Sequence, residues 1–566
     1  IPQEILTPII VIFCFAGAYS VNKSYFDVAV TLTFAVIAWL LYKLDFPTVP
    51  ILLGLVLGNM TETNFRRALL ISEGNPSIFV SSPLHRIYHP DHRRCSNDHP
   101  KQITGPERSE RGLTMRENII FYFTDQQRAD TCGCFGQPLD ITPNLDTLAA
   151  GGVKFDNAFS PQPVCGPCRA LFQTGKYPTE TGCFRNNIML PKNVKTLANY
   201  IEEAGYETAY IGKWHLASDG ELEKPPTIDH TITAVPKELR GGYTGFWRAA
   251  DVLEFTSHGY DGYVFDENNN QIDFKGYRPD CITDLALQFF DQYDRKKPFF
   301  MTVSQIEPHH QNDHNHYEGP AGSKEKYKDF VLPGDLAALK GNAAEEYPDY
   351  LGQCASLDEN LGRLVNRLKE EGLYDNTVII FASDHGSHFK TRNTDEHLNG
   401  YDDYKRSCHD AATHVPLVIA GGAFKGGKEI TELVSTESLP KTILAIAGVD
   451  VGDAMIGENL LDVVQGKTDN RANEVYSQIS ESRVGRSIRT EDYMYAVYAP
   501  GKNGGEYASA DLYADDFLYD LKKDPYELTN LIHDHAYDSV RLKMREKLLA
   551  WIEKAEHTRP VIVDQA

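Results

Sequence analysis

From residue 116 onward, apolar runs alternate with stretches that have the spacing and punctuation of helices. Thr142-Pro143 opens one helix that ends at Gly151, because Pro is favoured in the first turn and Gly at the end of a helix. A second helix covers residues 194–204 and is closed by Gly205. The strand-like runs are residues 119–123, 208–211, 299–303, 377–382 and 415–420. This alternation predicts an α/β fold in which a mostly parallel sheet is sandwiched by helices.

Polar side chains lie at or shortly after the ends of four of these strand-like runs. In parallel sheets, ligands bind beyond the carboxyl ends of the strands, where loops from distant parts of the chain meet. We therefore expect these polar groups to converge on one pocket, although they lie far apart in sequence. They are Asp125, then Lys213 and His215, then His309, and finally Asp384 and His385.

The first hundred residues have a different composition. Residues 5–19, 28–42 and 49–57 are almost entirely apolar, and with their flanks the first two can cross a bilayer, although each is shorter than a span of about 20 residues. Buried helices of a soluble core are the alternative. No basic region precedes them, and no small-residue cleavage site clearly follows, so they do not form a signal peptide.

Near the C-terminus, residues 475–479, 487–489 and 493–498 have the pattern of short strands, which predicts a smaller α+β subdomain. The sequence therefore divides into four parts. The parts are a helical membrane-like segment (1–86), a polar linker rich in His, Arg, Pro and Ser (87–115), the α/β domain (116–468) and a C-terminal subdomain (469–566).

Charge and cysteine usage narrow the function further. The 566 residues include 56 Lys and Arg against 79 Asp and Glu, a formal net charge of −23. This balance argues against nucleic-acid binding, which needs basic surface to neutralise phosphates. The ten cysteines show no disulfide spacing, which favours a reducing, cytoplasmic location. Cys132-x-Cys134 lacks the second Cys/His pair of a zinc site.

The tract Cys165-Gly166-Pro167-Cys168-Arg169 has two interpretations. Cys-x-x-Cys is typical of a dithiol oxidoreductase, but Val164 stands where such sites usually have Trp, and a lone Cys-x-x-Cys is a weak signal. The alternative is Cys-x-Pro-x-Arg running into a helix. Thr174-Gly175 follows the tract, and this wider pattern resembles the signature of the sulfatase family.

The resemblance to sulfatases extends over residues 116–531 and implies an alkaline-phosphatase-like fold. Several motifs in the family's order make it specific. They are Asp125-Gln126, Gly212-Lys213-Trp214-His215, Pro308-His309, Ser383-Asp384-His385-Gly386, Lys405 and Leu518-Tyr519-Asp520-Leu521.

The resemblance also implies a mechanism. Cys165 would be oxidised to formylglycine by a formylglycine-generating enzyme, and its hydrate would attack the sulfate ester of a carbohydrate or other small organic molecule. One divalent metal is implied. The resemblance favours Ca²⁺, and Mg²⁺ and Mn²⁺ are the alternatives. The implied metal ligands are Asp125, Gln126, residue 165, Asp384 and His385. The implied catalytic residues are Cys165, Arg169 as its support, Lys213 and Lys405 for the sulfuryl oxygens, His309 as acid and His215 as base.

Two departures from the family pattern leave alternatives open. Many sulfatases have Asp-Asp and Asp-Asn where this chain has Asp125-Gln126 and Asp384-His385. These pairs are more similar to choline sulfatases and phosphonate monoester hydrolases, so hydrolysis of a phosphonate monoester or phosphodiester stays open, as does the ligand role of Gln126. His310 is an alternative to its neighbour His309 as the acid.

Two further segments carry expectations of their own. Residues 53–79 resemble the tail of the large membrane subunit of tripartite tricarboxylate transporters, a likeness over about the first 85 residues. It implies membrane attachment through residues 1–58. Between His215 and His309 lies an aromatic insert, which is either a sugar or aryl pocket or ordinary packing. Its rings are Tyr243, Phe246, Trp247, Phe255, Tyr260, Tyr263 and Phe265.

Overall fold

The computed structural model describes residues 116–222, 224–392, 404–467 and 471–564, together with Thr33 and Lys43. The chain forms two compact units, residues 1–110 and 111–566. The predicted membrane-like segment and linker lie outside the described residues, apart from Thr33 and Lys43. No helix within the described ranges is long and apolar enough to cross a membrane, and attachment through residues 1–58 stays a prediction.

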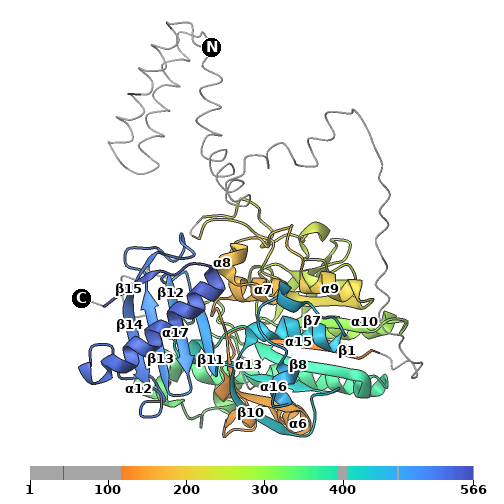
Figure 1. Ribbon diagram of the computed structural model, residues 1–566. Coiled ribbons are helices and arrows are strands. Elements are labelled where there is room, and N and C mark those ends of the chain that lie inside the picture. Colours follow the sequence, from red (N-terminus) through yellow and green to blue (C-terminus); the bar gives the residue numbers. More distant parts are fainter. Residues whose placement is uncertain are drawn as a thin grey trace, which may run out of the picture. The chain divides into compact units, whose positions relative to one another are not determined.

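A ten-stranded sheet in the order β10-β2-β9-β8-β1-β7-β3-β4-β5-β6 runs through the second unit. Its strands β10, β8, β1 and β7 are labelled in Figure 1. Its strands are β1 (Asn118–Thr124), β2 (Val153–Phe159), β3 (Glu207–Lys213), β4 (Phe246–Ala250), β5 (Asp261–Asp266), β6 (Gln271–Lys275), β7 (Phe299–Ser304), β8 (Thr377–Ser383), β9 (Leu417–Ala420) and β10 (Lys428–Ser435). Strands β8, β1, β7, β3 and β4 are parallel. Strand β9 is antiparallel to β8 and β2, and β4, β5 and β6 pair antiparallel.

The sheet is mixed: its predicted parallel strands are present, but β9, third in the strand order, and β5 run antiparallel to their neighbours. The parallel centre is as expected, but the run at residues 415–420 is an antiparallel strand. A short, fully buried apolar run has the same composition in either direction, because both of its faces are covered. Strand direction is set by the connections and cannot be seen in such a run.

Helices cover both faces of the large sheet. Alternate side chains of β1 point to opposite faces: Ile119 and Phe121 pack with one group of helices, and Ile120 and Tyr122 with the other. The first group is α7 (Cys165–Thr174), α9 (Leu197–Glu203), α15 (Leu439–Ile446) and α16 (Leu460–Val464). The second group is α6 (Pro143–Gly151), α10 (Arg278–Gln292) and α13 (Ala343–Glu370).

Helix α9 begins at Leu197, later than the expected residue 194. Thr196 caps it, because its side chain accepts a hydrogen bond from the backbone N–H of Asn199 while the Asn199 side chain accepts from the backbone of Thr196. This reciprocal capping box fixes the start of the helix.

A smaller C-terminal sheet has the order β11-β12-β13-β14-β15. Its strands are β11 (Glu474–Ile479), β12 (Gly485–Thr490), β13 (Tyr493–Tyr498), β14 (Leu512–Asp520) and β15 (Val561–Val563). Helix α17 (Asp538–Glu556) packs over it (Figure 1), and Leu548 and Ile552 of this helix share a core with Tyr495 and Leu518.

Candidate active site

The site lies at the carboxyl ends of four adjacent parallel strands, β8, β1, β7 and β3. Asp384 follows β8 and Asp125 follows β1, and the backbone N–H of Asp384 donates to the carbonyl of Thr124 over 3.2 Å. Gln126 and His215, directly beyond β1 and β3, have φ angles of 70° and 60°. Non-glycine residues rarely adopt this left-handed conformation, which is enriched at functional sites.

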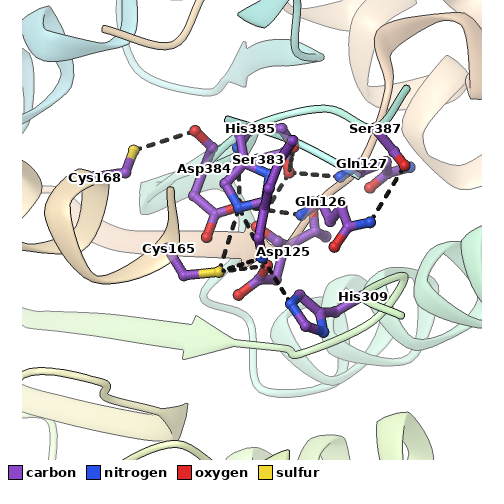
Figure 2. A network of polar contacts seen from close by, with 12 residues as sticks. Asp125, Gln126, Gln127, Cys165, Cys168, His309, Ser383, Asp384, His385 and Ser387 are labelled. Atoms are coloured by element: carbon purple, nitrogen blue, oxygen red, sulfur yellow. Dashed lines mark hydrogen bonds and ion pairs between the residues drawn. The ribbon is translucent and has the colours of Figure 1, made fainter. Parts of the chain in front are cut away.

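Cys165 lies at the centre of the cluster, at the start of α7. Its sulfur is 3.3 Å from Oδ1 of Asp125 and 3.3 Å from Nε2 of His385 (Figure 2). It also lies 3.0 Å from Nζ of Lys405. Burial raises the pKa of the Cys165 thiol, but the positive charges of Lys213 and Lys405 outweigh burial and hold it well below its usual value. Residue 165 therefore lies where anionic groups are stabilised.

Four residues could hold a metal ion. Asp125, Cys165, Asp384 and His385 are buried, and one ligand atom of each lies within 4.8 Å of the others. Burial and the charge of Asp125 raise the pKa of Asp384 above its ordinary value. A divalent cation between two buried carboxylates would remove this repulsion, so the donor set fits an oxygen-preferring cation that accepts one imidazole.

The side chains of Arg169 and Lys213 form ion pairs with these carboxylates. Nη2 of Arg169 is 2.9 Å from Oδ2 of Asp125 and 3.4 Å from Oδ2 of Asp384, and Nζ of Lys213 is 2.7 Å from Oδ2 of Asp125. Burial and the Cys165 sulfur push the pKa of Asp125 upward, but Lys213 and Arg169 prevail and lower it. Arg169 also donates to Oγ of Ser304 over 2.7 Å, which fixes its guanidinium beneath residue 165.

The structure separates the two neighbouring histidines. Nε2 of His309 lies 2.8 Å from Nζ of Lys405, and burial together with the Lys405 charge lowers the pKa of His309 to about 3. Nε2 of His310 instead lies 3.0 Å from the hydroxyl of Tyr404, and the two rings stack with centroids 4.2 Å apart. His309 therefore faces the Cys165 cluster, whereas His310 packs against Tyr404.

The remaining site residues from the sequence are placed as follows. His215 is buried, and its side chain helps to hold the pKa of the Cys165 thiol below its usual value. The backbone N–H of Gln126 donates to Oδ1 of Asp384 over 3.0 Å, and its side-chain amide donates to the Tyr317 hydroxyl and to Oγ of Ser387. These contacts orient Gln126 beside the acids, and its role as a metal ligand stays a prediction.

Cys168 does not form a working pair with Cys165. Its thiol donates to the backbone carbonyl of Asp384 over 3.2 Å, whereas the Cys165 sulfur faces Asp125 and His385 (Figure 2). Both cysteines are free. Burial raises the pKa of Cys168 well above its usual value, which argues against a dithiol redox site, since such sites need reactive thiolates.

Sequence analysis missed a buried link to the C-terminal sheet. Glu481, in the loop between β11 and β12, is fully buried. Its Oε1 accepts from the backbone N–H of Asn186 over 2.6 Å, and its Oε2 accepts from Nε of Arg406. Oδ1 of Asn186 in turn accepts from the backbone N–H of Gly166 over 2.9 Å. Glu481 thus connects the residues next to Cys165 and Lys405, but no spacing or motif marks it in the sequence.

The aromatic insert mostly fills the core. Tyr243 and Trp247 are buried, with centroids 5.0 Å and 5.3 Å from the ring of Tyr210. Phe246 and Phe265 are also buried. Trp214 joins the same group. Only Phe255 and Tyr260 are at least half exposed among the rings named, so packing explains most of the insert.

Comparison with protein families assigns three parts of the chain. The family model described as Sulfatase matches residues 117–449, and the model for the C-terminal part of N-sulphoglucosamine sulphohydrolase matches residues 398–554. Residues 1–53 match the tripartite tricarboxylate transporter TctA family, which confirms the resemblance seen in the sequence.

Individual relatives and solved structures agree. A sulfatase of Escherichia coli strain K12 is 30% identical over 475 residues, which are 78% of this chain and 88% of that protein. An ulvan-active sulfatase of Formosa agariphila is 29% identical over 457 residues, covering 76% of this chain and 80% of that one. A solved sulfatase from Bacteroides fragilis has a TM-score of 0.64 at 24% identity, covering 80% of this chain and 98% of that chain. With the family model matching more than half of its length, the chain belongs to the sulfatase family.

Proposed function

We propose that this sulfatase uses a formylglycine derived from Cys165 and one divalent cation, Ca²⁺ first, to hydrolyse a sulfate ester of a carbohydrate. The observation that carries the proposal is the position of the Cys165 sulfur, 3.0–3.3 Å from Lys405, Asp125 and His385. A nucleophile formed there has the Lys405 side chain beside it, and the nearby Asp125 and Asp384 could hold a cation. Cationic groups at the reacting centre are what attack on an anionic ester requires.

The substrate class rests on the relatives. Named proteins similar to this chain include an N-acetylglucosamine-6-O-sulfatase of Bacteroides thetaiotaomicron, 27% identical over 528 residues, which are 78% of this chain and 87% of that one. The ulvan-active sulfatase is named for a polysaccharide. A sulfated sugar is therefore the class that we assign, without choosing the sugar or the position of the sulfate.

Protein side chains would neutralise the substrate's charge. Lys213 and Lys405 bring two ammonium groups to the cluster, and Arg169 braces Asp125 and Asp384 from below. A formylglycine hydrate at position 165 would supply a hydroxyl nucleophile. A divalent cation held by Asp125, Asp384 and His385 would supply further positive charge at the reacting centre.

The Lys405–His309 pair would deliver the proton to the departing oxygen. In the free site His309 is neutral, because its pKa is about 3, and the Lys405 ammonium lies 2.8 Å from its Nε2. The negative charge of a bound sulfate ester would raise the pKa of His309, since opposite charges favour the protonated form. The pair would then hold the proton that general-acid catalysis needs. His215 would accept the proton when the aldehyde is restored.

Two measurements test the proposal. The mass of the tryptic peptide that contains residue 165 should be about 18 Da below that of the cysteine form when the protein is produced together with a formylglycine-generating enzyme. An aryl sulfate should then be hydrolysed in proportion to the converted fraction. Full hydrolysis by protein that carries only the free thiol would overturn the proposal.

Phosphonate monoester hydrolysis is the second candidate. The Asp125-Gln126 and Asp384-His385 pairs favour it, and the phosphonate monoester hydrolase of Agrobacterium radiobacter has a related fold, with a TM-score of 0.54 at 22% identity, covering 78% of this chain and 96% of that chain. The ratio of kcat/KM for an aryl sulfate to that for the matching aryl phosphonate ranks the two. A ratio below one would assign the phosphonate as the better substrate.

A further inference from the structure

A second cluster of metal-ligating side chains lies at the surface on two loops. His258 precedes β5, and the other four residues lie on the loop after β7. One ligand atom of each residue in the triad His258, Asp313 and His314 lies within 4.8 Å of the others, and the same holds for His314, His316 and Glu318. The two triads share His314, so five ligating side chains meet in one place.

The imidazole rings are arranged in parallel. His258 and His314 stack with centroids 4.6 Å apart and an interplanar angle of 12°, and His316 lies 6.0 Å from His314 at 22°. Nε2 of His258 is 2.9 Å from Oδ2 of Asp313, and Nδ1 of His314 contacts Glu318. Each of these two imidazoles is thus paired with its own carboxylate.

Hydrogen bonds already join the two loops and order the second one. Oε2 of Glu318 accepts from the backbone N–H of Gly259 over 2.9 Å, next to His258. Oδ1 of Asp313 accepts from Nε2 of Gln311 over 2.7 Å, and the backbone N–H of Gln311 donates to the carbonyl of His316. Because this framework is fixed without a ligand, a metal ion binding here would lose little free energy to loop ordering.

The donor set selects the class of metal. Imidazole nitrogens suit Zn²⁺, Co²⁺, Ni²⁺ and Cu²⁺, whereas Ca²⁺ and Mg²⁺ prefer oxygen ligands. We propose that His258, Asp313 and His314 form a surface site for a zinc-class ion, with His316 and Glu318 as further ligands. About half of the His258 and Asp313 side chains is exposed, at 47% and 49%, so water can complete the coordination. This site is separate from the buried centre around Cys165.

Calorimetric titration of Ca²⁺-loaded full-length protein with Zn²⁺ tests the proposal. Wild-type protein should bind one equivalent of Zn²⁺. The His258→Ala and His314→Ala variants should either not bind this equivalent or bind it at least tenfold more weakly. His535→Ala is the matched control, since His535 is also an exposed histidine beside a carboxylate, Asp538, at 3.3 Å. It should bind Zn²⁺ as the wild type does, and millimolar Mg²⁺ should not compete.

A second variant separates this site from the buried one. Asp384→Asn alters the buried ligand set and should keep the surface equivalent. Thermal melts of both His258→Ala and His314→Ala without added metal should match the wild type, because the side chains are exposed. The surface site would be overturned if His258→Ala and His314→Ala bound Zn²⁺ with the stoichiometry and affinity of the wild type. It would also be overturned if only Asp384→Asn lost the Zn²⁺ equivalent.

Discussion

Lys405 and His309 lie side by side above residue 165, with Nζ of the lysine 2.8 Å from Nε2 of the imidazole. The two come from distant parts of the chain, and both are buried. The buried ammonium of Lys405 disfavours a second positive charge on the imidazole of His309. It also favours the binding of an anion. The free site therefore favours an anionic ligand, as the proposed function requires.

The first prediction separates His309 from His310. His309→Ala should lower kcat about 10²–10⁴-fold on an alkyl sulfate, because the leaving oxygen loses its proton donor. The loss should be much smaller on an aryl sulfate with an electron-withdrawing group, whose leaving oxygen needs no proton. His310→Ala, which removes a contact to Tyr404, should show no such dependence on the leaving group. Equal losses on both substrates for His309→Ala would remove its role as acid.

The second prediction concerns the two neighbouring cysteines. Cys165→Ala should abolish sulfate hydrolysis, because the proposed nucleophile is formed from residue 165. Cys168→Ser keeps a donor toward the backbone carbonyl of Asp384 and should retain activity within a few-fold. Initial rates on an aryl sulfate, with circular dichroism to verify folding, give the comparison. Insulin reduction that depends on Cys168 would instead support the oxidoreductase interpretation.

The third prediction concerns metal removal. Dialysis against a chelator should abolish hydrolysis and lower the Tm, because Asp125 and Asp384 are left buried with less positive charge between them. Readdition of Ca²⁺ should restore the most activity, with Mg²⁺ and Mn²⁺ tested at the same concentration. Activity that survives complete chelation, verified by elemental analysis, would contradict the divalent centre.

The fourth prediction tests Glu481 as a positioning residue. Glu481→Ala should lower kcat at least tenfold with a smaller effect on KM, because the residues beside Cys165 and Lys405 lose their common anchor. Glu481→Gln keeps one acceptor and should recover part of kcat. Glu203→Gln, which changes an exposed ion pair with Lys195, is the control. A loss confined to thermal stability, with kcat intact, would make Glu481 purely structural.

The fifth prediction concerns a buried ion pair next to the site. Arg278 and Glu307 are both 1% exposed, with Nε 2.8 Å from Oε1. Arg278→Met should destabilise the fold by about 3–5 kcal/mol, because it leaves a buried carboxylate without its partner. Lys195→Met breaks an exposed pair and should cost about 1 kcal/mol or less. Urea unfolding of the two variants measures the difference, and similar values for both would contradict the expected penalty.

Much of the site was predictable because its residues sit at one kind of position. Asp125, Lys213 and Asp384 each end or directly follow a buried strand, and parallel strands bring their carboxyl ends to one edge. A motif at such a position specifies both the chemistry and the place. The direction of β9 was not predictable, since four buried apolar residues carry no directional pattern.

Other features depend on tertiary contacts that no local pattern records. Glu481 lies in a loop with a φ angle of 63°, and its partners Asn186 and Arg406 are equally unmarked in sequence. The split between His309 and His310 depends on which side of the loop each ring occupies, which adjacent identical residues cannot reveal. The apolar pattern placed the start of α9 at residue 194, but the capping box of Thr196 sets it at Leu197.

The carboxylate of Glu481 links the small C-terminal sheet to the residues beside Cys165 and Lys405. A fragment that ends before residue 469 would keep every residue proposed to touch the ester, yet would lack the group that braces them. We therefore expect turnover to change when this sheet is replaced by that of a relative, unless the relative has an acidic residue at the position of Glu481. Through this carboxylate the small sheet reaches the segments that carry residues 165 and 405.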